Sequence, residues 1–546
     1  MSSSNSYGNK TDNRAVKSST IPLPGACRAC RRRKVKCDRL QPCSQCAQLD
    51  LVCIFSHVAA KRKHPIRGRV VAKARETDSV FPSSPPIPTT PPLGSSVSLD
   101  DDDIEHGGAS QLRWQGIQGA VGSDYTEEFF VALIPDFEQL VYPVNPIISP
   151  DEIRTAIANR QASYEDAALV YAFAAVTTFL TLTPQALHDR AVAQTNDLMQ
   201  RCLESHRRAD LGESGGLMLE ELPVTVKRVM TCIFLEVSMM AFKRFDRSFA
   251  LLREAIALLQ TLKIRQSTSR DAHPEIRGIA RCQRLYWEAY IHERFLTIAA
   301  GYPSILPSLR SGVPLPDLSI PPHIDLGFNR LIHLFLVMDE PFLEHWSAQQ
   351  DSREAAPTIN SQWIETKQVQ LDQDEVSAAN AEAELTARGQ NGLTELQHTD
   401  LFVTRLWMRT LVWQLALSHG LLSSEPRTNT HEGLSLGFPA QRLSTQLRSL
   451  VARLTSVASI SAQGTGILQK LFEITSTIAD VMALHAAHGQ IQEDTRTRME
   501  DFVVVVQFLI GFDRIREEQR GYLREKLDTL RQLYSNTGTA NFFGKY

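Results

Sequence analysis

The sequence predicts a small cysteine-rich module of two short helix-strand halves and a large all-α domain, joined by a disordered linker. Six of the nine cysteines lie between Cys27 and Cys53. Six prolines fall within residues 82–92 and four aspartates at 100–103, a composition that cannot bury a core. Over residues 123–535, apolar residues recur at helical spacing without the alternation typical of strands.

Length and composition fit a multidomain protein without an export signal. The 546 residues suggest two or three units. No apolar run is long enough to cross a bilayer, and the first residues, MSSSNSYGNKTDNR, lack the apolar core of a secretory signal. Because the cytosol and nucleus keep thiols reduced, we expect clustered cysteines here to bind metal rather than to form disulfides.

The net charge of −3 hides a strongly basic segment near the N-terminus. Residues 27–75 hold 14 Lys and Arg against two Asp, a balance of +12, and residues 1–26 add +2. The remaining chain therefore carries −17. This asymmetry indicates a polyanionic partner for the basic segment and a different role for the acidic body.

The changes in composition divide the chain into successive regions. These are a disordered N-terminus at 1–24, the cysteine module at 25–58, a basic and then Pro/Ser/Asp-rich linker at 59–122, a helical domain at 123–535 with a polar insertion at 352–395, and a C-terminal tail at 536–546.

Three helices of the large domain follow from apolar periodicity. The segment SFALLREAIALLQTL places Leu252, Ile256 and Leu259 on one face. The apolar segment VKRVMTCIFLEVSMMAF precedes it, and the short turn KRFDRS between them predicts an antiparallel pair. RCQRLYWEAYIHERFLTIA is a third helix, which Gly and Pro in GYPSILP end.

Side chains on these helices predict a structural rather than a catalytic body. We expect Trp287 and Tyr290 in the core, and Glu293 and Arg294 as a local ion pair. One face of the last helix carries Leu523, Leu527, Leu530 and Tyr534, which fits core packing better than a dimer seam. The sequence has no G-x-S-x-G, P-loop or H-E-x-x-H motif, so we do not expect an enzyme.

The clustered cysteines form the pattern C-x2-C-x6-C twice, joined by five residues. The x2 spacing puts two thiolates on one helical turn, where they can bind one ion, and four thiolates close a tetrahedral zinc site. Six thiolates fill one such site with two left over, or two sites if two thiolates bridge. The symmetry of the repeat favours two zinc ions with one bridging cysteine from each half.

This pattern resembles the fungal binuclear zinc-cluster transcription factors over the whole of Cys27–Cys53. The resemblance implies that Cys27 and Cys43 bridge the two ions and that Lys34 reads a CGG-like triplet of double-stranded DNA in the major groove. The remaining residues that it implies are the metal ligands Cys30, Cys37, Cys46 and Cys53, and Arg31, Arg33 and Lys36 against phosphates or the edge of the triplet. Independently of the family, Lys and Arg are the side chains that donate to guanine O6 and N7.

Seven basic residues after the last cysteine suit nuclear import and phosphate contacts, which predicts a nuclear protein. They are Lys61, Arg62, Lys63, Arg67, Arg69, Lys73 and Arg75. No heptad register follows the cysteines, because Pro65, Gly68 and the proline run interrupt it. The oligomeric state therefore stays open between a monomer and a dimer formed through the helical body.

The body segment RCQRLYWEAYIHERFLTIAAGYPSIL resembles the regulatory domain of the same fungal family. We therefore expect a sequence-specific DNA-binding transcription regulator that reads a CGG-like triplet. Its expected partners are the transcription machinery or co-regulators. Its pathway is nutrient use or a secondary-metabolite gene cluster. The alternative is a co-regulator that uses the zinc module as a scaffold for protein contacts, without a specific DNA site of its own.

Overall fold

The computed structural model divides the chain into two units, residues 1–65 and 66–546. In the first unit it describes residues 37–38, 40 and 43–47. In the second it describes residues 125–181, 188–210, 222, 224–268, 276–350, 359–424, 430–454, 464–487, 495–512, 515 and 517–536. The regions expected to be disordered at 1–24 and to form a linker at 59–122 lie outside these residues.

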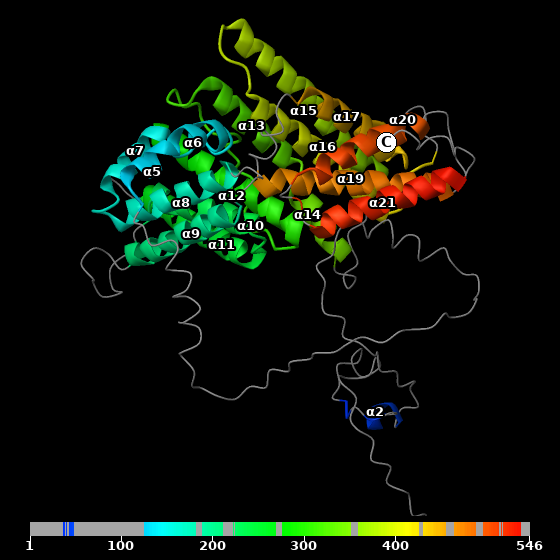
Figure 1. The fold of residues 1–546 in the computed structure, drawn as a ribbon, viewed down its shortest axis with the longest axis horizontal. Coiled ribbons are helices and arrows are strands. Elements are labelled where there is room, and N and C mark those ends of the chain that lie inside the picture. Colours follow the sequence, from blue (N-terminus) through cyan, green and yellow to red (C-terminus); the bar gives the residue numbers. More distant parts are fainter. Residues whose placement is uncertain are drawn as a thin grey trace, which may run out of the picture. The chain divides into compact units, whose positions relative to one another are not determined.

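The described residues of both units form helices, with one isolated backbone pairing between Ser423 and Ser435 (Figure 1). The first unit contributes α2 (Ser44–Ala47). The second contributes α5 (Glu127–Ala132), α6 (Ile134–Leu140), α7 (Pro150–Asn159), α8 (Tyr164–Thr181), α9 (His188–Asp210), α10 (Val226–Ala241), α11 (Phe245–Thr268), α12 (Ile276–Ala300), α13 (Pro322–Leu336), α14 (Glu340–Gln350), α15 (Ser361–Ala387), α16 (Glu395–Ser418), α17 (Ser444–Arg453), α19 (Gly464–Ala487), α20 (Thr495–Ile510) and α21 (Glu517–Asn536), with the short turns η1 (Glu432–Leu434) and η2 (Pro439–Leu443). None of the helices in the described ranges is long and apolar enough to cross a membrane.

Helices α5–α12 form the first half of the body, around the two apolar helices α8 and α10. Helix α8 is buried over most of its circumference because apolar residues lie on all its sides, and α6, α7, α9 and α10 pack around it. Helices α10 and α11 pack on each other through the turn at 242–244, where Lys243 takes a positive φ of 61°. Such a short connection makes them the antiparallel pair that the sequence predicts.

Helix α12 is the predicted third helix of this half, and it packs against α10 and α11. Trp287 and Tyr290 are 0% and 1% exposed, which confirms their expected place in the core. The Trp287 Nε1 donates to the carbonyl of Gly312 at 3.0 Å, so the indole also holds the segment that follows the helix. The helix ends at Ala300, and Gly301 takes the left-handed conformation with φ 75°.

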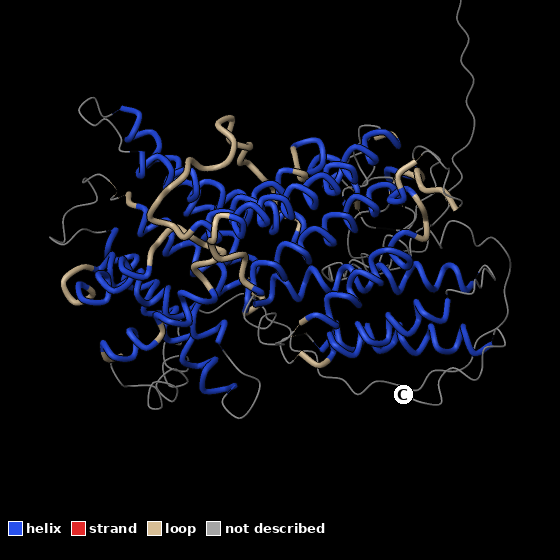
Figure 2. Tube along the Cα trace, turned by 90° about the horizontal axis from the view of Figure 1, so that it is seen from above, coloured by secondary structure: helices blue, strands red, loops and turns tan. Residues whose placement is uncertain are grey.

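Helices α13–α21 form the second half, around α16 and α19. Seen from above, the described parts of the chain are helices joined by loops and turns (Figure 2). Trp407 of α16 is buried, and its Nε1 donates to Glu473 of α19 at 2.6 Å. Helix α21 packs against α19 and α20. Its predicted apolar face is buried, which supports core packing and not a dimer seam; this face is Leu523, Leu527, Leu530 and Tyr534.

The stretch at 352–395, expected as a polar insertion, contains the 27-residue helix α15, which packs against α13 and α16. Ile364 and Leu371 are buried, but the stripe they form is narrow. Its charged residues are paired across helices, as Asp374 is with Arg405 at 2.9 Å. The polar composition therefore reflects interhelical ion pairs within the packed body.

Candidate metal centre

Cys43 directly precedes helix α2 of the first unit, and Cys46 lies within it. The N–H groups of Cys46 and Ala47 both donate to the carbonyl of Cys43, at 3.0 and 2.9 Å. Both cysteines are fully buried. In the second half of the repeat, Cys43 and Cys46 therefore lie within one turn of backbone hydrogen bonds.

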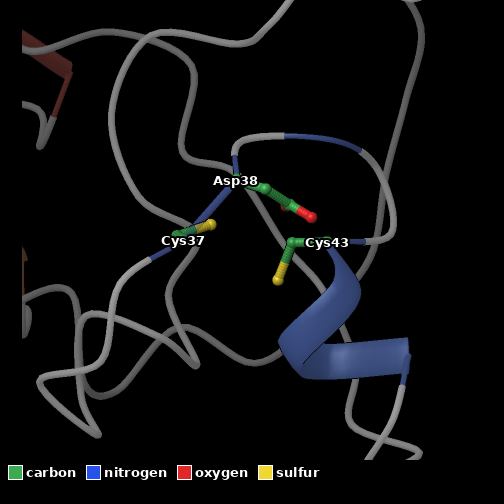
Figure 3. A group of neighbouring side chains, drawn as sticks. All are labelled: Cys37, Asp38 and Cys43. Atoms are coloured by element: carbon green, nitrogen blue, oxygen red, sulfur yellow. The ribbon is translucent and has the colours of Figure 1, made fainter.

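Cys37 belongs to the first half of the repeat and lies beside Cys43 of the second (Figure 3). The two sulfurs and a carboxylate oxygen of Asp38 all lie within 4.8 Å of one another. Two thiolates on one tetrahedral zinc, with Zn–S bonds of about 2.3 Å, stand about 3.8 Å apart. The two halves therefore meet closely enough to share an ion, and the donor set fits zinc.

Asp38 shapes the loop between the halves. Its Oδ1 accepts the N–H of Leu40 at 3.2 Å, and its Oδ2 accepts the N–H of Ser44 at 2.9 Å. Hydrogen bonds from Ser44 lower the pKa of the Asp38 carboxyl, which keeps it a charged acceptor at neutral pH. Because both oxygens hold backbone groups, Asp38 braces the loop and leaves metal binding to the thiols.

The other predicted site residues lie outside the described part of the chain. They are the metal ligands Cys27, Cys30 and Cys53, the DNA-contacting residues Arg31, Arg33, Lys34 and Lys36, and the seven basic residues of the linker. Their roles stay predictions.

A second group of potential metal ligands lies in the helical body. His206 of α9, Cys232 of α10 and Glu254 of α11 each place a ligand atom within 4.8 Å of the others. The Nε2 of His206 lies 2.9 Å from Glu254 Oε1 and 3.6 Å from Cys232 Sγ. Sequence reasoning missed this group because its members come from three separate helices with no motif spacing.

The neighbouring charges make this second group a polar brace and not a metal site. Arg207 donates to both oxygens of Glu254, at 2.9 and 3.0 Å. The hydrogen bond from His206, with help from Arg207, lowers the pKa of Glu254 to about 2. Burial raises the pKa of the Cys232 thiol. A protonated thiol and a carboxylate already paired with a guanidinium are poor ligands.

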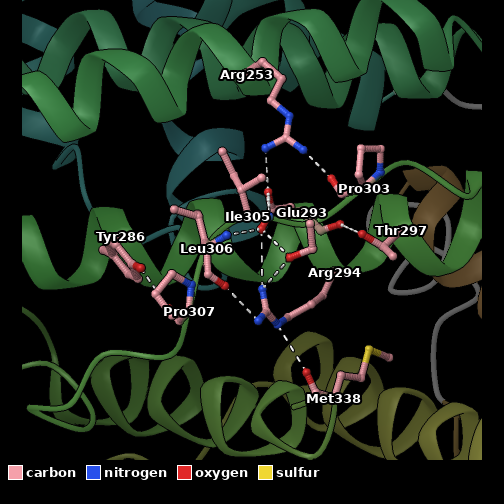
Figure 4. A network of polar contacts seen from close by, with 11 residues as sticks. Arg253, Tyr286, Glu293, Arg294, Thr297, Pro303, Ile305, Leu306, Pro307 and Met338 are labelled. Carbon is pink, nitrogen blue, oxygen red and sulfur yellow. Dashed lines mark hydrogen bonds and ion pairs between the residues drawn. The ribbon is translucent and has the colours of Figure 1, made fainter. Parts of the chain in front are cut away.

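Glu293 and Arg294 hold the segment after α12 (Figure 4). Glu293 accepts the N–H groups of Ile305 and Leu306 at 2.8 and 2.9 Å, and Arg253 donates to it at 2.8 Å. Arg294 lies 3.5 Å from Glu293 and donates to the carbonyl of Leu306 at 2.9 Å. The predicted structural ion pair is confirmed, within a larger network that fixes this loop.

Comparison with known proteins finds a match for the cysteine module. The family model described as the fungal Zn(2)-Cys(6) binuclear cluster domain matches residues 25–63. The C6 finger domain transcription factor adaR of Aspergillus niger is 38% identical over 77 residues, which are 14% of this chain and 9% of that protein. The match includes the described cysteines at 37, 43 and 46.

Two longer alignments extend into the body. The probable sucrose utilization protein SUC1 of Candida albicans is 20% identical over 264 residues, 48% of each chain. The maltose fermentation regulatory protein MAL13 of Saccharomyces cerevisiae is 22% identical over 465 residues, 84% of each chain. The chain thus spans less than half the length of the sucrose protein and of adaR. The printed names of these relatives are those of a transcription factor, a sucrose utilization protein and a maltose fermentation regulatory protein.

Proposed function

We propose that this chain is a nuclear transcription regulator that reads a CGG-like DNA triplet, because residues 25–63 match the model of the fungal Zn(2)-Cys(6) binuclear cluster domain. Domains of this family hold two zinc ions. The observation that carries the proposal is the approach of the Cys37 and Cys43 sulfurs, one from each half of the repeat, beside the fully buried Cys46.

The six clustered thiolates would hold the two ions, with Cys27 and Cys43 as bridges. Bound zinc supplies the folding free energy, on the order of 10 kcal/mol, that so short a segment cannot obtain from apolar burial. Asp38 keeps the loop between the halves in the conformation that brings Cys37 to Cys43. The hydrogen bonds of Asp38 would thus bring the ligands close together, and bound zinc would hold them at that distance.

The basic residues between Cys30 and Cys37 would contact DNA. Lys34 donates to guanine acceptors in the major groove, and this contact reads sequence. Arg31, Arg33 and Lys36 contact phosphates or the edge of the triplet, and the basic linker residues add contacts that do not depend on sequence.

The helical body would regulate the activity of the DNA-binding module, with transcription machinery or co-regulators as partners. The two long alignments reach proteins named for sucrose utilization and maltose fermentation. These names support nutrient use over a secondary-metabolite gene cluster as the pathway.

Substitution of Lys34 tests the reading of the triplet. In the zinc-loaded full chain, Lys34→Ala should weaken binding to a CGG duplex by about tenfold to a hundredfold, the worth of one good base contact. Binding to a duplex with the triplet scrambled should stay unchanged, as should the zinc content. Fluorescence anisotropy with both duplexes measures the two affinities, and Lys17→Ala, outside the module, is the matched control. An undiminished preference for the CGG duplex in Lys34→Ala would remove the reading role.

The same titration separates the proposal from the co-regulator alternative. A wild-type chain with two bound zinc ions and no preference between the two duplexes would favour a zinc scaffold for protein contacts.

A further inference from the structure

A cavity of about 160 Å³ lies in the helical body, between its two halves. Helices α6, α8, α10 and α12 line it from the first half, and α13, α16 and α19 from the second. Most of its wall is apolar; Val176, Phe179, Phe234, Ile291 and Phe335 contribute to it. An apolar cavity of about 150 Å³ holds a molecule the size of benzene, so this one has room for one apolar group of that size.

Carboxyl groups outnumber cations on one part of the wall. Glu288 and His292 of α12, Asp400 of α16 and Lys470 of α19 line the cavity. Glu236 of α10 does not line it, but this side chain is fully buried and contacts His292. Three carboxyl groups are therefore present for two cations.

His292 is the partner of Glu236. Its Nδ1 lies 2.6 Å from one oxygen of Glu236, whose other oxygen accepts the hydroxyl of Ser248 at 2.9 Å. Burial lowers the pKa of His292, but the charge of Glu236 and hydrogen bonds to Glu236 and Glu288 outweigh it and raise the pKa to about 10. The imidazolium therefore stays charged at neutral pH, and the charge of Glu236 offsets it.

Lys470 is the partner of Asp400. Its Nζ donates to Asp400 Oδ1 at 3.3 Å and to the hydroxyl oxygen of Thr404 at 2.7 Å. The Thr404 hydroxyl in turn donates to the same Asp400 oxygen at 3.2 Å. Because these two pairs each balance their own charges, Glu288 is the carboxyl group of the wall that lacks a cation of its own.

Glu288 is 2% exposed and has one oxygen available to a ligand. Its Oε1 lies 3.0 Å from His292 Nε2, and among the described residues no donor contacts its Oε2. Burial raises the pKa of Glu288; the hydrogen bond from His292 works against this rise, and the charges of Glu236 and Asp400 add to it. This carboxyl group is therefore stabilised by a proton or by a cation that enters the cavity.

An organic cation fits this site better than a metal ion. Among the described residues of the wall, no three side chains of ligand type place their donor atoms within 4.8 Å of one another. An ammonium group, in contrast, can pair with a single carboxylate through a charge-assisted hydrogen bond. The apolar majority of the wall would then cover the rest of such a molecule.

We propose that this cavity binds a small organic cation, which carries a primary ammonium group on an apolar body about the size of one ring. The ammonium group donates to Glu288 Oε2, and the apolar body fills the rest of the cavity. The site lies in the helical body and its occupancy is measured without DNA, so its failure would leave the proposed reading of DNA untouched.

Four probes with one ring each test the charge of the ligand on the zinc-loaded full chain: benzylammonium, benzyl alcohol, toluene and benzoate. Calorimetric titration at neutral pH measures the affinities. Benzylammonium should bind about tenfold to a hundredfold more tightly than toluene and benzyl alcohol, the worth of one charge-assisted hydrogen bond, and benzoate should bind most weakly. Absence of benzylammonium binding at millimolar concentration, or equal or tighter binding of any other probe, overturns the proposal.

Glu288→Gln tests the ion pair itself. The variant keeps the shape of the side chain and removes its charge, so it should bind toluene as the wild type does and lose the preference for benzylammonium. Glu344→Gln, exposed on α14, is the matched control and should keep the preference. A preference for benzylammonium that persists in Glu288→Gln would overturn the role of this carboxylate.

Cavity-filling variants locate the site. Gly466 of α19 lines the cavity, and an added Cβ would meet Phe295 at an unstrained 3.9 Å, so Gly466→Leu should fill the space and abolish binding. Gly521→Leu, in a helix with open space around it, is the matched control and should bind normally. Ala241→Leu, on the α10 side of the cavity, repeats the test if the first variant folds poorly. Benzylammonium binding that survives both cavity-filling variants would place the site elsewhere and overturn the proposal.

Discussion

The contacts of Glu254 and His206 join three helices. Glu254 lies on α11 and contacts His206 and Arg207 of α9, and His206 in turn contacts Cys232 of α10. Nothing in the sequence predicts this group, because its members share no motif spacing and lie 22 to 48 residues apart. The burial of Trp287 was predictable, since it depends only on helical spacing and apolar character.

The lowered pKa of Glu254 predicts a pH-dependent contribution to stability. The folded-state pKa is about 2, below the ordinary value of 4.5, so the contribution is present above pH 4.5 and is lost as pH falls toward 2. Glu254→Gln should lower the free energy of unfolding by about 2 kcal/mol at pH 7, and the difference from wild type should shrink below pH 4.5. Urea titrations at several pH values measure it.

Glu138→Gln, at an exposed position of α6, is the control for Glu254→Gln and should leave the free energy of unfolding unchanged. A loss in Glu254→Gln that is equally large at pH 3 and pH 7 would contradict the ionic origin of the effect.

At the scale of elements, a helix can be predicted from the sequence when its apolar face is clearly distinct from its polar face. The α10–α11 pair and α12 are predictable because their apolar faces are broad and their ends carry Gly, Pro or short polar turns. Helix α15 is not, because its burial depends on ion pairs such as Lys367–Asp339 at 2.6 Å, whose partners lie on other elements. The loop after α12 likewise depends on Glu293. The four groups that donate hydrogen bonds to its carboxylate lie outside its own helical turn, on Arg253, Ser304, Ile305 and Leu306.

Removal of the Glu293 charge should release that loop. Glu293 is 1% exposed, and a Gln side chain would turn an amide N–H₂ toward donors that need an acceptor. Glu293→Gln should cost about 3 kcal/mol of unfolding free energy and speed hydrogen exchange at Ile305 and Leu306, measured by mass spectrometry. Glu344→Gln, exposed on α14, should change neither. Unaltered exchange at both amides in Glu293→Gln would show that the loop is held by other contacts.

At the scale of the whole molecule, two units depend on different sources of stability. The body buries a continuous apolar core, whereas the first unit has cysteines where a core would be. The ligand pattern of the first unit was predictable because a metal fixes ligand spacing along the chain. The cavity of the body was not, because residues from seven helices line it.

Zinc removal should therefore affect one unit and spare the other. A chelator should abolish binding to a CGG duplex and leave the unfolding curve of the body in urea unchanged. Tryptophan fluorescence reports on the second unit and not on the first, because every tryptophan lies beyond residue 65. Five lie in the body, Trp287, Trp346, Trp363, Trp407 and Trp413, and Trp114 lies in the predicted linker. Added zinc should restore DNA binding, and a shifted tryptophan transition after chelation would mean that the two units stabilise each other.

The brace formed by Asp38 also constrains how this module can evolve. Its bond to the N–H of Ser44 closes the chain over residues 39–43, which include most of the stretch between Cys37 and Cys43. An insertion or deletion in that stretch would disturb the bond, and loss of the acidic side chain would remove this one constraint on the length of the loop. The length of this loop and the acidic residue at position 38, which is not one of the proposed zinc ligands, should therefore change together during evolution.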